Sequence, residues 1–401
     1  MGLNDTATAE RLHIGFFGTC NAGKSSLVNA VTAQTLSIVS AVRGTTTDPV
    51  KKTMELLPLG PVVIFDTPGT DDDTALGKER TKKTEQVLAK TDIAVLVVDA
   101  TAGKKQPDRD LTKRFQERNI PFITVYNKAD LLEKRPALDE GELYVSAATG
   151  EGVKELKERL GSCATAKAKK PILADLITAG DIVVLVTPID ESAPKGRIIL
   201  PQQMTLREIL DTHATAIVCQ DSELKDTLAA LAKKPALVVT DSQVFDKAAA
   251  ATPADIPLTS FSILMARYKG DLAALVRGFQ ALSGITDEDH ILISEGCTHH
   301  RQCNDIGTVK LPSWIRSFTA ADPKISFTSG GEFPEDLSPY KVIVHCGGCM
   351  LNEKEMQHRI ARARAAGVPM VNYGVAIAGM RGILARSLQL FPDILSILNR
   401  A

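Results

Sequence analysis

The feature that most constrains this chain is a glycine-rich turn near its N-terminus. The residues Gly18-Thr19-Cys20-Asn21-Ala22-Gly23-Lys24-Ser25 follow the apolar run 13–17 and precede a predicted helix. The pattern G-x-x-x-x-G-K-S between a strand and a helix is typical of a phosphate-binding loop, because the glycines let backbone N–H groups point at phosphate oxygens. The positive end of the following helix favours the same anion. We therefore expect the chain to begin with an α/β domain that binds a nucleotide.

The loop also predicts what each side chain does. Lys24 is expected to reach the β and γ phosphates, and the hydroxyl of Ser25 is expected to ligate Mg²⁺. The residues predicted to surround the phosphates are Asn21, Ala22, Gly23, Lys24, Ser25 and Ser26.

Three later segments supply the rest of a nucleotide site. Asp66-Thr67-Pro68-Gly69 ends the next apolar strand, where Asp66 can hold Mg²⁺ through water and the Gly69 amide can reach the γ phosphate. Asn127-Lys128-Ala129-Asp130 ends a later strand. The Asp130 carboxylate can accept hydrogen bonds from guanine N1–H and its 2-amino group, which adenine lacks, and Lys128 can lie along the base. Ser146-Ala147 can offer backbone N–H groups to guanine O6.

These segments resemble, in order and spacing, the nucleotide-binding motifs of translation-factor-like GTPases. Thr45-Thr46-Thr47-Asp48 resembles the first switch of tRNA-modification and ribosome-assembly GTPases, which implies Mg²⁺ binding by Thr46. The resemblance implies a catalytic set of Lys24, Thr46, Asp66 and Gly69. Thr70 stands where Ras-type proteins have a water-orienting Gln, so we expect slow intrinsic hydrolysis. Asn21 resembles the potassium-binding asparagine of the same branch, which implies K⁺ stimulation.

Strand and helix patterns alternate along the whole chain and predict three α/β segments with mainly parallel sheets. The first, residues 1–165, is the predicted GTP-binding domain. The stretch Gly161–Pro171 is interpreted as a linker after a helix at Val153–Leu160. Residues 171–272 and 273–401 are predicted to be two smaller domains. The predicted strands are 13–17, 62–65, 93–98, 122–126, 143–145, 182–186, 216–219, 237–240, 290–294, 324–328, 341–345 and 369–372.

Four of the seven cysteines lie in the third segment. Cys346-Gly347-Gly348-Cys349 follows the predicted strand 341–345, and Cys297 and His299 follow the strand 290–294. The carboxyl ends of neighbouring parallel strands meet at one sheet edge, where ligands bind in open α/β folds. By itself, C-x-x-C is compatible with a redox dithiol, a zinc site or an iron–sulfur site.

The full pattern, Cys297-x-His299 followed at a distance by His345-Cys346-x-x-Cys349, resembles the C-terminal signature of the HydF family of FeFe-hydrogenase maturation GTPases. The resemblance spans the chain and implies a 4Fe-4S cluster on Cys297, Cys346 and Cys349, with His345 or His299 as a possible fourth ligand. His300, Cys303 and Asp305 are further local candidates. It also implies homodimerisation through 171–272, and a scaffold that receives the 2Fe precursor of the H-cluster from radical-SAM maturases and delivers it to apo FeFe-hydrogenase.

The amino-acid composition limits the other functions that the chain could have. A net charge of −1 and an aromatic content of 4% disfavour nucleic acid as the main partner. No apolar run approaches the roughly 18 residues that span a bilayer, and an odd cysteine count favours a reducing cytoplasm. Two alternatives remain at this point. One is an RNA or ribosome-assembly GTPase with a structural metal domain. The other is a metal scaffold in which GTP only stabilises the fold.

Overall fold

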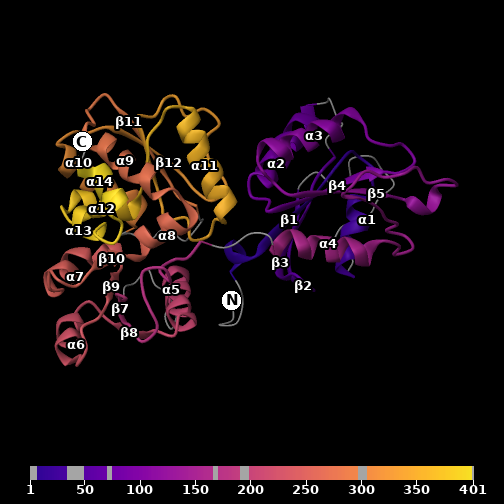
Figure 1. The fold of residues 1–401 in the computed structure, drawn as a ribbon. Coiled ribbons are helices and arrows are strands. Elements are labelled where there is room, and N and C mark those ends of the chain that lie inside the picture. The colour runs from indigo at the N-terminus through magenta and orange to yellow at the C-terminus, as the bar shows by residue number, and fades with distance from the viewer. Residues whose placement is uncertain are drawn as a thin grey trace. The chain divides into compact units, whose positions relative to one another are not determined.

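The computed structural model describes residues 7–33, 49–69, 75–165, 170–189, 198–296 and 305–399. The chain divides into two compact units, residues 1–169 and 170–401 (Figure 1). The described part of the chain contains no helix that is both long and apolar enough to cross a membrane.

The first unit is built on a six-stranded sheet in the order β2-β3-β1-β4-β5-β6. All neighbouring strands run parallel except the pair β2 and β3, which is antiparallel. The central strand β4 is an almost uninterrupted apolar run because helices cover both faces of the sheet. The strands are β1 Leu12–Phe17, β2 Val50–Leu56, β3 Gly60–Asp66, β4 Ile93–Asp99, β5 Phe122–Asn127 and β6 Glu142–Tyr144.

Among the described residues of the first unit, two helices pack on each face of this sheet. Leu27 of α1 and Leu156 of α4 belong to the core on one face. Leu88 of α2 and Phe115 of α3 belong to the core on the other face. The helices are α1 Lys24–Thr32, α2 Ala75–Leu88, α3 Gln106–Glu117 and α4 Val153–Thr165, with short 3₁₀ turns η1 Thr8–Glu10 and η2 Ala129–Leu131.

The predicted linker at 161–171 is wrong in its first part, because α4 continues to Thr165. Gly161 does not end the helix, since it packs against Pro58: a Cβ at residue 161 would lie 2.9 Å from the proline Cγ. Cys163, which falls within the predicted linker, packs against the core on that face. The sequence pattern does not predict the strand β2. Its exposed Lys51, Lys52 and Thr53 give it no apolar pattern.

The second unit holds two four-stranded parallel sheets, in the orders β10-β9-β7-β8 and β12-β11-β13-β14. The parallel arrangement of the fold is thus as predicted. The strand β10 is an addition to the strands predicted from the sequence. The strands are β7 Ile182–Val186, β8 Thr215–Cys219, β9 Leu237–Thr240, β10 Leu258–Ser260, β11 His290–Ser294, β12 Lys324–Thr328, β13 Val342–His345 and β14 Met370–Asn372.

One continuous hydrophobic core includes residues of both sheets. Helix α8 connects the two sheets, because it packs against α5 and β10 and also against α11 and α12. The domain boundaries at 171 and 273 stay predictions. The helices are α5 Leu200–Asp211, α6 Leu224–Ala230, α7 Phe245–Ala251, α8 Phe261–Lys269, α9 Leu272–Ser283, α10 Leu311–Thr319, α11 Glu353–Ala365, α12 Tyr373–Met380, α13 Leu384–Ser387 and α14 Pro392–Asn399, with the 3₁₀ turn η3 Ser242–Val244 and the π-helical turn η4 Ile306–Lys310.

Candidate functional site

The phosphate loop lies between β1 and α1, as the sequence pattern predicts. Gly23 has φ +84°, and a Cβ there would lie 2.2 Å from Nδ2 of Asn127. Only glycine combines this backbone conformation with so close an approach. The turn therefore brings the start of α1 against the end of β5, where the predicted guanine-binding segment begins.

Lys24 is the first residue of α1 and is 7% exposed. Its ammonium donates hydrogen bonds to the backbone oxygens of Gly18, at 3.1 Å, and Thr19, at 2.7 Å. These carbonyls hold the cation inside the loop that the phosphates would enter. A buried ammonium requires polar or anionic partners, so this placement favours an anion in the loop.

Two of the residues predicted to hold magnesium, Ser25 directly and Asp66 through water, lie in contact. The Ser25 hydroxyl donates to Oδ2 of Asp66 at 2.6 Å, and Asp66 is buried at the end of β3. Hydroxyl and carboxylate oxygens are the ligands that Mg²⁺ prefers. The chain after Asp66 also lies against the phosphate loop, since a Cβ on Gly69 would be 2.6 Å from the amide nitrogen of Cys20.

Asn127 connects the predicted base-binding segments to the phosphate loop. Its Nδ2 donates to the carbonyl of Ala22 at 3.0 Å, and its Oδ1 accepts from the amide of Ala147 at 3.1 Å. Ser146 is fully buried, and its Oγ accepts from the amide of Thr149 at 3.1 Å. The Ala147 amide, predicted to reach guanine O6, is thus engaged by Asn127 here.

Lys128 and Asp130 follow β5, with Lys128 just before the 3₁₀ turn η2 and Asp130 within it. Lys128 has φ +64°, and its ammonium pairs with Oδ2 of Asp99 at 2.5 Å. Burial alone would raise the pKa of Asp99, but hydrogen bonds from Lys128 and Thr101 outweigh burial and lower that pKa. The pair therefore fixes Lys128 beside the end of β4. Asp130 is exposed, which leaves its carboxylate accessible.

The structure describes some of the other residues that are predicted to act at the nucleotide site, and others lie outside the described residues. Ala22 is buried, Ser26 is half-buried and Asn21 is exposed with φ +62°. Thr45, Thr46 and Thr70 lie outside the described residues, so their predicted roles stay predictions.

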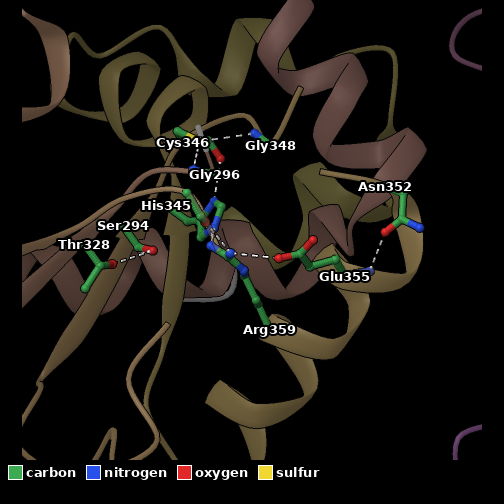
Figure 2. A network of polar contacts seen from close by, with 10 residues as sticks. Ser294, Gly296, Thr328, His345, Cys346, Gly348, Asn352, Glu355 and Arg359 are labelled. Atoms are coloured by element: carbon green, nitrogen blue, oxygen red, sulfur yellow. Dashed lines mark hydrogen bonds and ion pairs between the residues drawn. The ribbon is translucent and has the colours of Figure 1, made fainter. Parts of the chain in front are cut away.

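The cysteine segment follows β13 at the carboxyl edge of the second sheet of the second unit. Strand β13 is paired with β11 in a register that places His345 opposite Ser294. The Cys346 sulfur accepts hydrogen bonds from the amides of Gly296, at 3.0 Å, and Gly348, at 3.4 Å (Figure 2). Gly296 directly precedes Cys297, so the chain reaches Cys346 one residue before the third predicted thiol.

Cys349 lies beside a buried lysine. Burial raises the pKa of the Cys349 thiol, and the charge of Lys269 acts in the opposite direction. Lys269 is 2% exposed, and its ammonium donates to the carbonyls of Cys349, at 3.3 Å, and Leu351, at 3.0 Å. A single lysine at the end of an apolar helix carries no motif, and sequence reasoning missed it.

His345 is fully buried and both of its ring nitrogens have partners. Nε2 lies 3.1 Å from the Arg359 guanidinium, and Nδ1 lies 2.7 Å from the carbonyl of Cys346 (Figure 2). Arg359 has only donors, so the proton is assigned to Nδ1. Burial and the charge of Arg359 lower the pKa of His345 to about 3. As placed, His345 would have to give up one hydrogen bond to become a ligand.

Arg359 itself was missed by the sequence analysis. It is 2% exposed and donates to Oε1 of Glu355 at 3.0 Å and to the carbonyl of Gly330 at 2.8 Å. Its guanidinium also lies over the ring of Phe333, 5.2 Å from the centroid. Its spacing from Glu355 fits a surface ion pair on a helix equally well, so the sequence held no sign of burial.

The remaining predicted cluster residues are Cys297, His299, His300 and Cys303, and all lie outside the described residues. Accordingly, no group of three or more metal-binding side chains occurs in the part that the structure describes. Among the described residues, neither Cys346 nor Cys349 takes part in a disulfide. Soft sulfur donors, with backbone amides directed at one of them, fit a thiolate-bound metal or iron–sulfur cluster. Asp305 instead caps η4 through Thr308.

Known proteins resemble the first unit in sequence. A family model described as a 50S ribosome-binding GTPase matches residues 13–128. The tRNA modification GTPase MnmE of Legionella pneumophila (strain Corby) is 39% identical over 151 residues, which are 37% of this chain and 34% of that protein. GTPase Der of Kosmotoga olearia is 32% identical over 170 residues, 38% of each protein. The matched region thus spans about a third of these relatives' length.

Among solved structures, that of an Aquifex aeolicus Era variant bound to GDP and AlF4⁻ is 19% identical, with a TM-score of 0.36 over 52% of this chain and 94% of that one. The second unit matches two family models. The hydrogen maturase F dimerization domain matches residues 172–270, and the hydrogen maturase F tetramerization domain matches residues 273–390. Together with the GTPase model that matches residues 13–128, these two models cover most of the sequence. The chain therefore belongs to the HydF family of hydrogenase maturation GTPases.

Proposed function

We propose that this chain binds and hydrolyses GTP with Mg²⁺ and carries a 4Fe-4S cluster on Cys297, Cys346 and Cys349. In this proposal it is the scaffold that receives the 2Fe precursor of the H-cluster and delivers it to apo FeFe-hydrogenase in the cytoplasm. Radical-SAM maturases supply the precursor. Family membership and the coexistence of a nucleotide site with a thiol site in one chain support the proposal.

One observation carries the cluster part of the proposal. The Gly296 amide donates to the Cys346 sulfur at 3.0 Å, so the segment leading to Cys297 and the segment of Cys346 and Cys349 meet at one sheet edge. Three thiolates would hold the cluster and leave one iron without a cysteine ligand. The bound cluster supplies an iron with an exchangeable site, and the chain's role is to hold and shield it. His345 and His299 stay candidates for the fourth ligand.

The nucleotide part rests on a small set of side chains. Lys24 would bind the β and γ phosphates, Ser25 and Asp66 would hold Mg²⁺, and Asp130 would select guanine. Thr46 and the segment after Gly69 would respond to the γ phosphate, so that hydrolysis changes how partners dock. Replacing Lys24 with Ala should then change partner binding as well as GTP binding. Unchanged partner binding, cluster loading and hydrogenase maturation would contradict the switch.

We also propose that K⁺ stimulates slow intrinsic hydrolysis through Asn21. A cation beside the phosphates would supply charge that an arginine supplies in other GTPases. Turnover measured in K⁺ and in Na⁺ at equal ionic strength tests this. Equal rates, or an Asn21→Ala variant that keeps the full K⁺ effect, would contradict it.

The cluster is tested by anaerobic purification with iron and sulfide analysis and EPR. We expect about four irons per chain in the unmodified protein, since a 4Fe-4S cluster contains four. Cys346→Ser and Cys349→Ser should lose most of the cluster. The chain offers matched controls in Cys163→Ser and Cys219→Ser, because these thiols lie in α4 and β8 and should leave the iron content unchanged. One zinc and no sulfide would overturn the cluster assignment.

A further inference from the structure

Lys269 is a buried cation that touches the cysteine loop from outside the segment that contains the cysteines. It ends α8, within the region matched by the dimerization model, whereas Cys346 and Cys349 lie within the region matched by the tetramerization model. Its ammonium donates to the carbonyls of Cys349 and Leu351, at 3.3 and 3.0 Å. The site is therefore completed by a residue from the preceding α/β segment.

From this juxtaposition we propose that Lys269 is a positioning residue for the cluster: it fixes the Cys349–Leu351 loop and offsets the negative charge of the thiolate-bound state. The inference rests on the proposed cluster function of Cys346 and Cys349. Lys269 lies outside the cysteine motif, and its proposed task is to hold the loop and offset the negative charge.

The position of Lys269 is itself fixed. Nε2 of Gln357, on α11, donates to the backbone carbonyls of Lys269 and Gly270, at 3.1 and 3.0 Å. Helix α8 and helix α11 are thereby tied at the point where the ammonium leaves the helix. Lys269 as a whole is 2% exposed, so the side chain that carries the ammonium is buried. A fixed donor of this kind can hold a loop in one conformation.

The loop that Lys269 holds is conformationally demanding. Gly348 has φ +64°, and a Cβ there would lie 2.7 Å from the sulfur of Met356. Asn352 then accepts a hydrogen bond from the amide of Glu355 and caps the N-terminus of α11. Lys269 binds carbonyls between these two points. Losing it would leave two backbone acceptors without this donor and allow the loop to move.

The charge matters beyond the hydrogen bonds. Thiolate ligation and cluster binding bring negative charge into a buried region, and a buried cation nearby stabilises that charge more strongly than in water. The reduced cluster is one charge more negative than the oxidised cluster. A fixed positive charge therefore favours the reduced form and raises the midpoint potential. Partners around a metal site commonly tune it in this way.

The test compares Lys269→Gln with Lys269→Arg in the full-length, anaerobically reconstituted protein. Gln keeps a hydrogen-bond donor and removes the charge, whereas Arg keeps both. Lys247→Gln is the matched control, because Lys247 is an exposed lysine of the same unit and pairs with Asp221. The readouts are the midpoint potential from a dye-mediated EPR titration and the rate of cluster loss to an iron chelator. Circular dichroism checks folding.

We expect Lys269→Gln to shift the midpoint potential to more negative values and to release its cluster about tenfold faster, since partners around a metal site contribute on this scale. Lys269→Arg and Lys247→Gln should remain close to the unmodified protein. If Lys269→Gln has an unchanged potential and an unchanged release rate, this inference is overturned while the cluster assignment stands. If the unmodified protein binds no iron and sulfide, the proposed function fails first and the inference falls with it.

Should Lys269→Gln fail to fold, Lys269→Met replaces it as the variant without the charge. Lys269→Arg remains the variant that keeps the charge, and the two are compared. A folded Met variant that keeps the potential contradicts the charge argument. If both neutral variants unfold and Lys269→Arg folds with an altered potential and rapid cluster loss, the charge alone is not sufficient and the proposal is wrong.

Discussion

The side-chain amide of Asn127 donates a hydrogen bond to the backbone carbonyl of Ala22 over 3.0 Å. The same amide group accepts a hydrogen bond from Ala147 through its oxygen. One side chain at the end of β5 therefore ties the phosphate loop to the loop after β6. This arrangement makes the phosphate-binding and base-binding halves of the site dependent on each other.

Asn127→Ala should lower both stability and nucleotide affinity. The substitution leaves a buried carbonyl and a partly buried amide without this partner, and a fully buried group left in this way costs about 1–3 kcal/mol. Urea unfolding of the nucleotide-free protein measures the first effect, and GTP and GDP titrations measure the second. Gln116→Ala, at an exposed position of α3, is the control. Weaker nucleotide binding with unchanged unfolding would mean that the bridge matters only when nucleotide is bound.

Asp130→Asn should change the base that the site prefers. The carboxylate can accept two hydrogen bonds from guanine, whereas an asparagine amide offers one acceptor and one donor. Xanthine carries an oxygen where guanine carries its 2-amino group, so it matches the amide. We expect GTP affinity to fall at least tenfold, a loss that matches one hydrogen bond to a charged group, and XTP affinity to rise. Competition among GTP, XTP and ATP measures this, and unchanged GTP preference would remove Asp130 from the base site.

Much of this fold is predictable because parallel strands covered on both faces are apolar along their whole length. The predicted strands Ile182–Val186 and His290–Ser294, which are inner strands of their sheets, have the bounds that the structure gives. The strand β2 is not predictable in this way, because an exposed edge strand next to one neighbour needs no apolar pattern. The predicted end of α4, before Gly161, comes too early. Gly161 packs against Pro58, and the sequence alone does not distinguish such a glycine from one that ends a helix.

The residues of the candidate site likewise divide into those that the sequence predicts and those that it does not. The phosphate loop, Asp66 and Asn127 are predictable, since each belongs to a sequence motif that directly follows a predicted strand. Lys269 and Arg359 are not, because they contact the cysteine loop through backbone carbonyls and a buried histidine, and only the packing of α8 and α11 brings them there. Residue spacing records contacts made by a motif. It does not record contacts made by the elements packed around that motif.

Asp99 and Lys128 should make a pH-dependent contribution to stability. The pKa of Asp99 is lower in the folded protein than in the unfolded chain. The stabilisation is therefore present above the unfolded pKa of about 3.9 and is lost as the pH falls through the folded pKa. We expect at most about 1 kcal/mol, because the pair is partly exposed. The difference in urea unfolding between the unmodified protein and Asp99→Asn should stay nearly constant from about pH 7 to about pH 5 and should shrink as the pH falls below about 4 toward the folded pKa of Asp99. A difference that stays constant with pH would mean that Asp99 acts by packing alone.

Asp66→Asn should weaken the response to Mg²⁺ while the fold survives. Asparagine can still accept the hydrogen bond from Ser25, but it lacks the charge that would hold hydrated Mg²⁺. We expect the Mg²⁺ concentration for half-maximal GTP hydrolysis to rise about tenfold, in line with losses at residues that hold a metal indirectly. A magnesium titration with EDTA-treated protein measures it. An unchanged midpoint with a reduced maximal rate would instead assign Asp66 to the hydrolysis step.

Val218→Glu should weaken self-association of the second unit. The two hydrogen maturase F models that match this unit are named for dimerization and tetramerization, and β8 is an edge strand of its first sheet. An edge strand offers backbone N–H and C=O groups to a second copy, and Val218 on it is 44% exposed. A carboxylate there would be buried or repelled in a symmetric contact, so the sedimentation coefficient should fall toward that of a monomer. Leu57→Glu is the control, because Leu57 is an 82% exposed apolar residue of the first unit. If Val218→Glu sediments like the unmodified protein while Leu57→Glu dissociates it, the association surface lies on the first unit and not at β8.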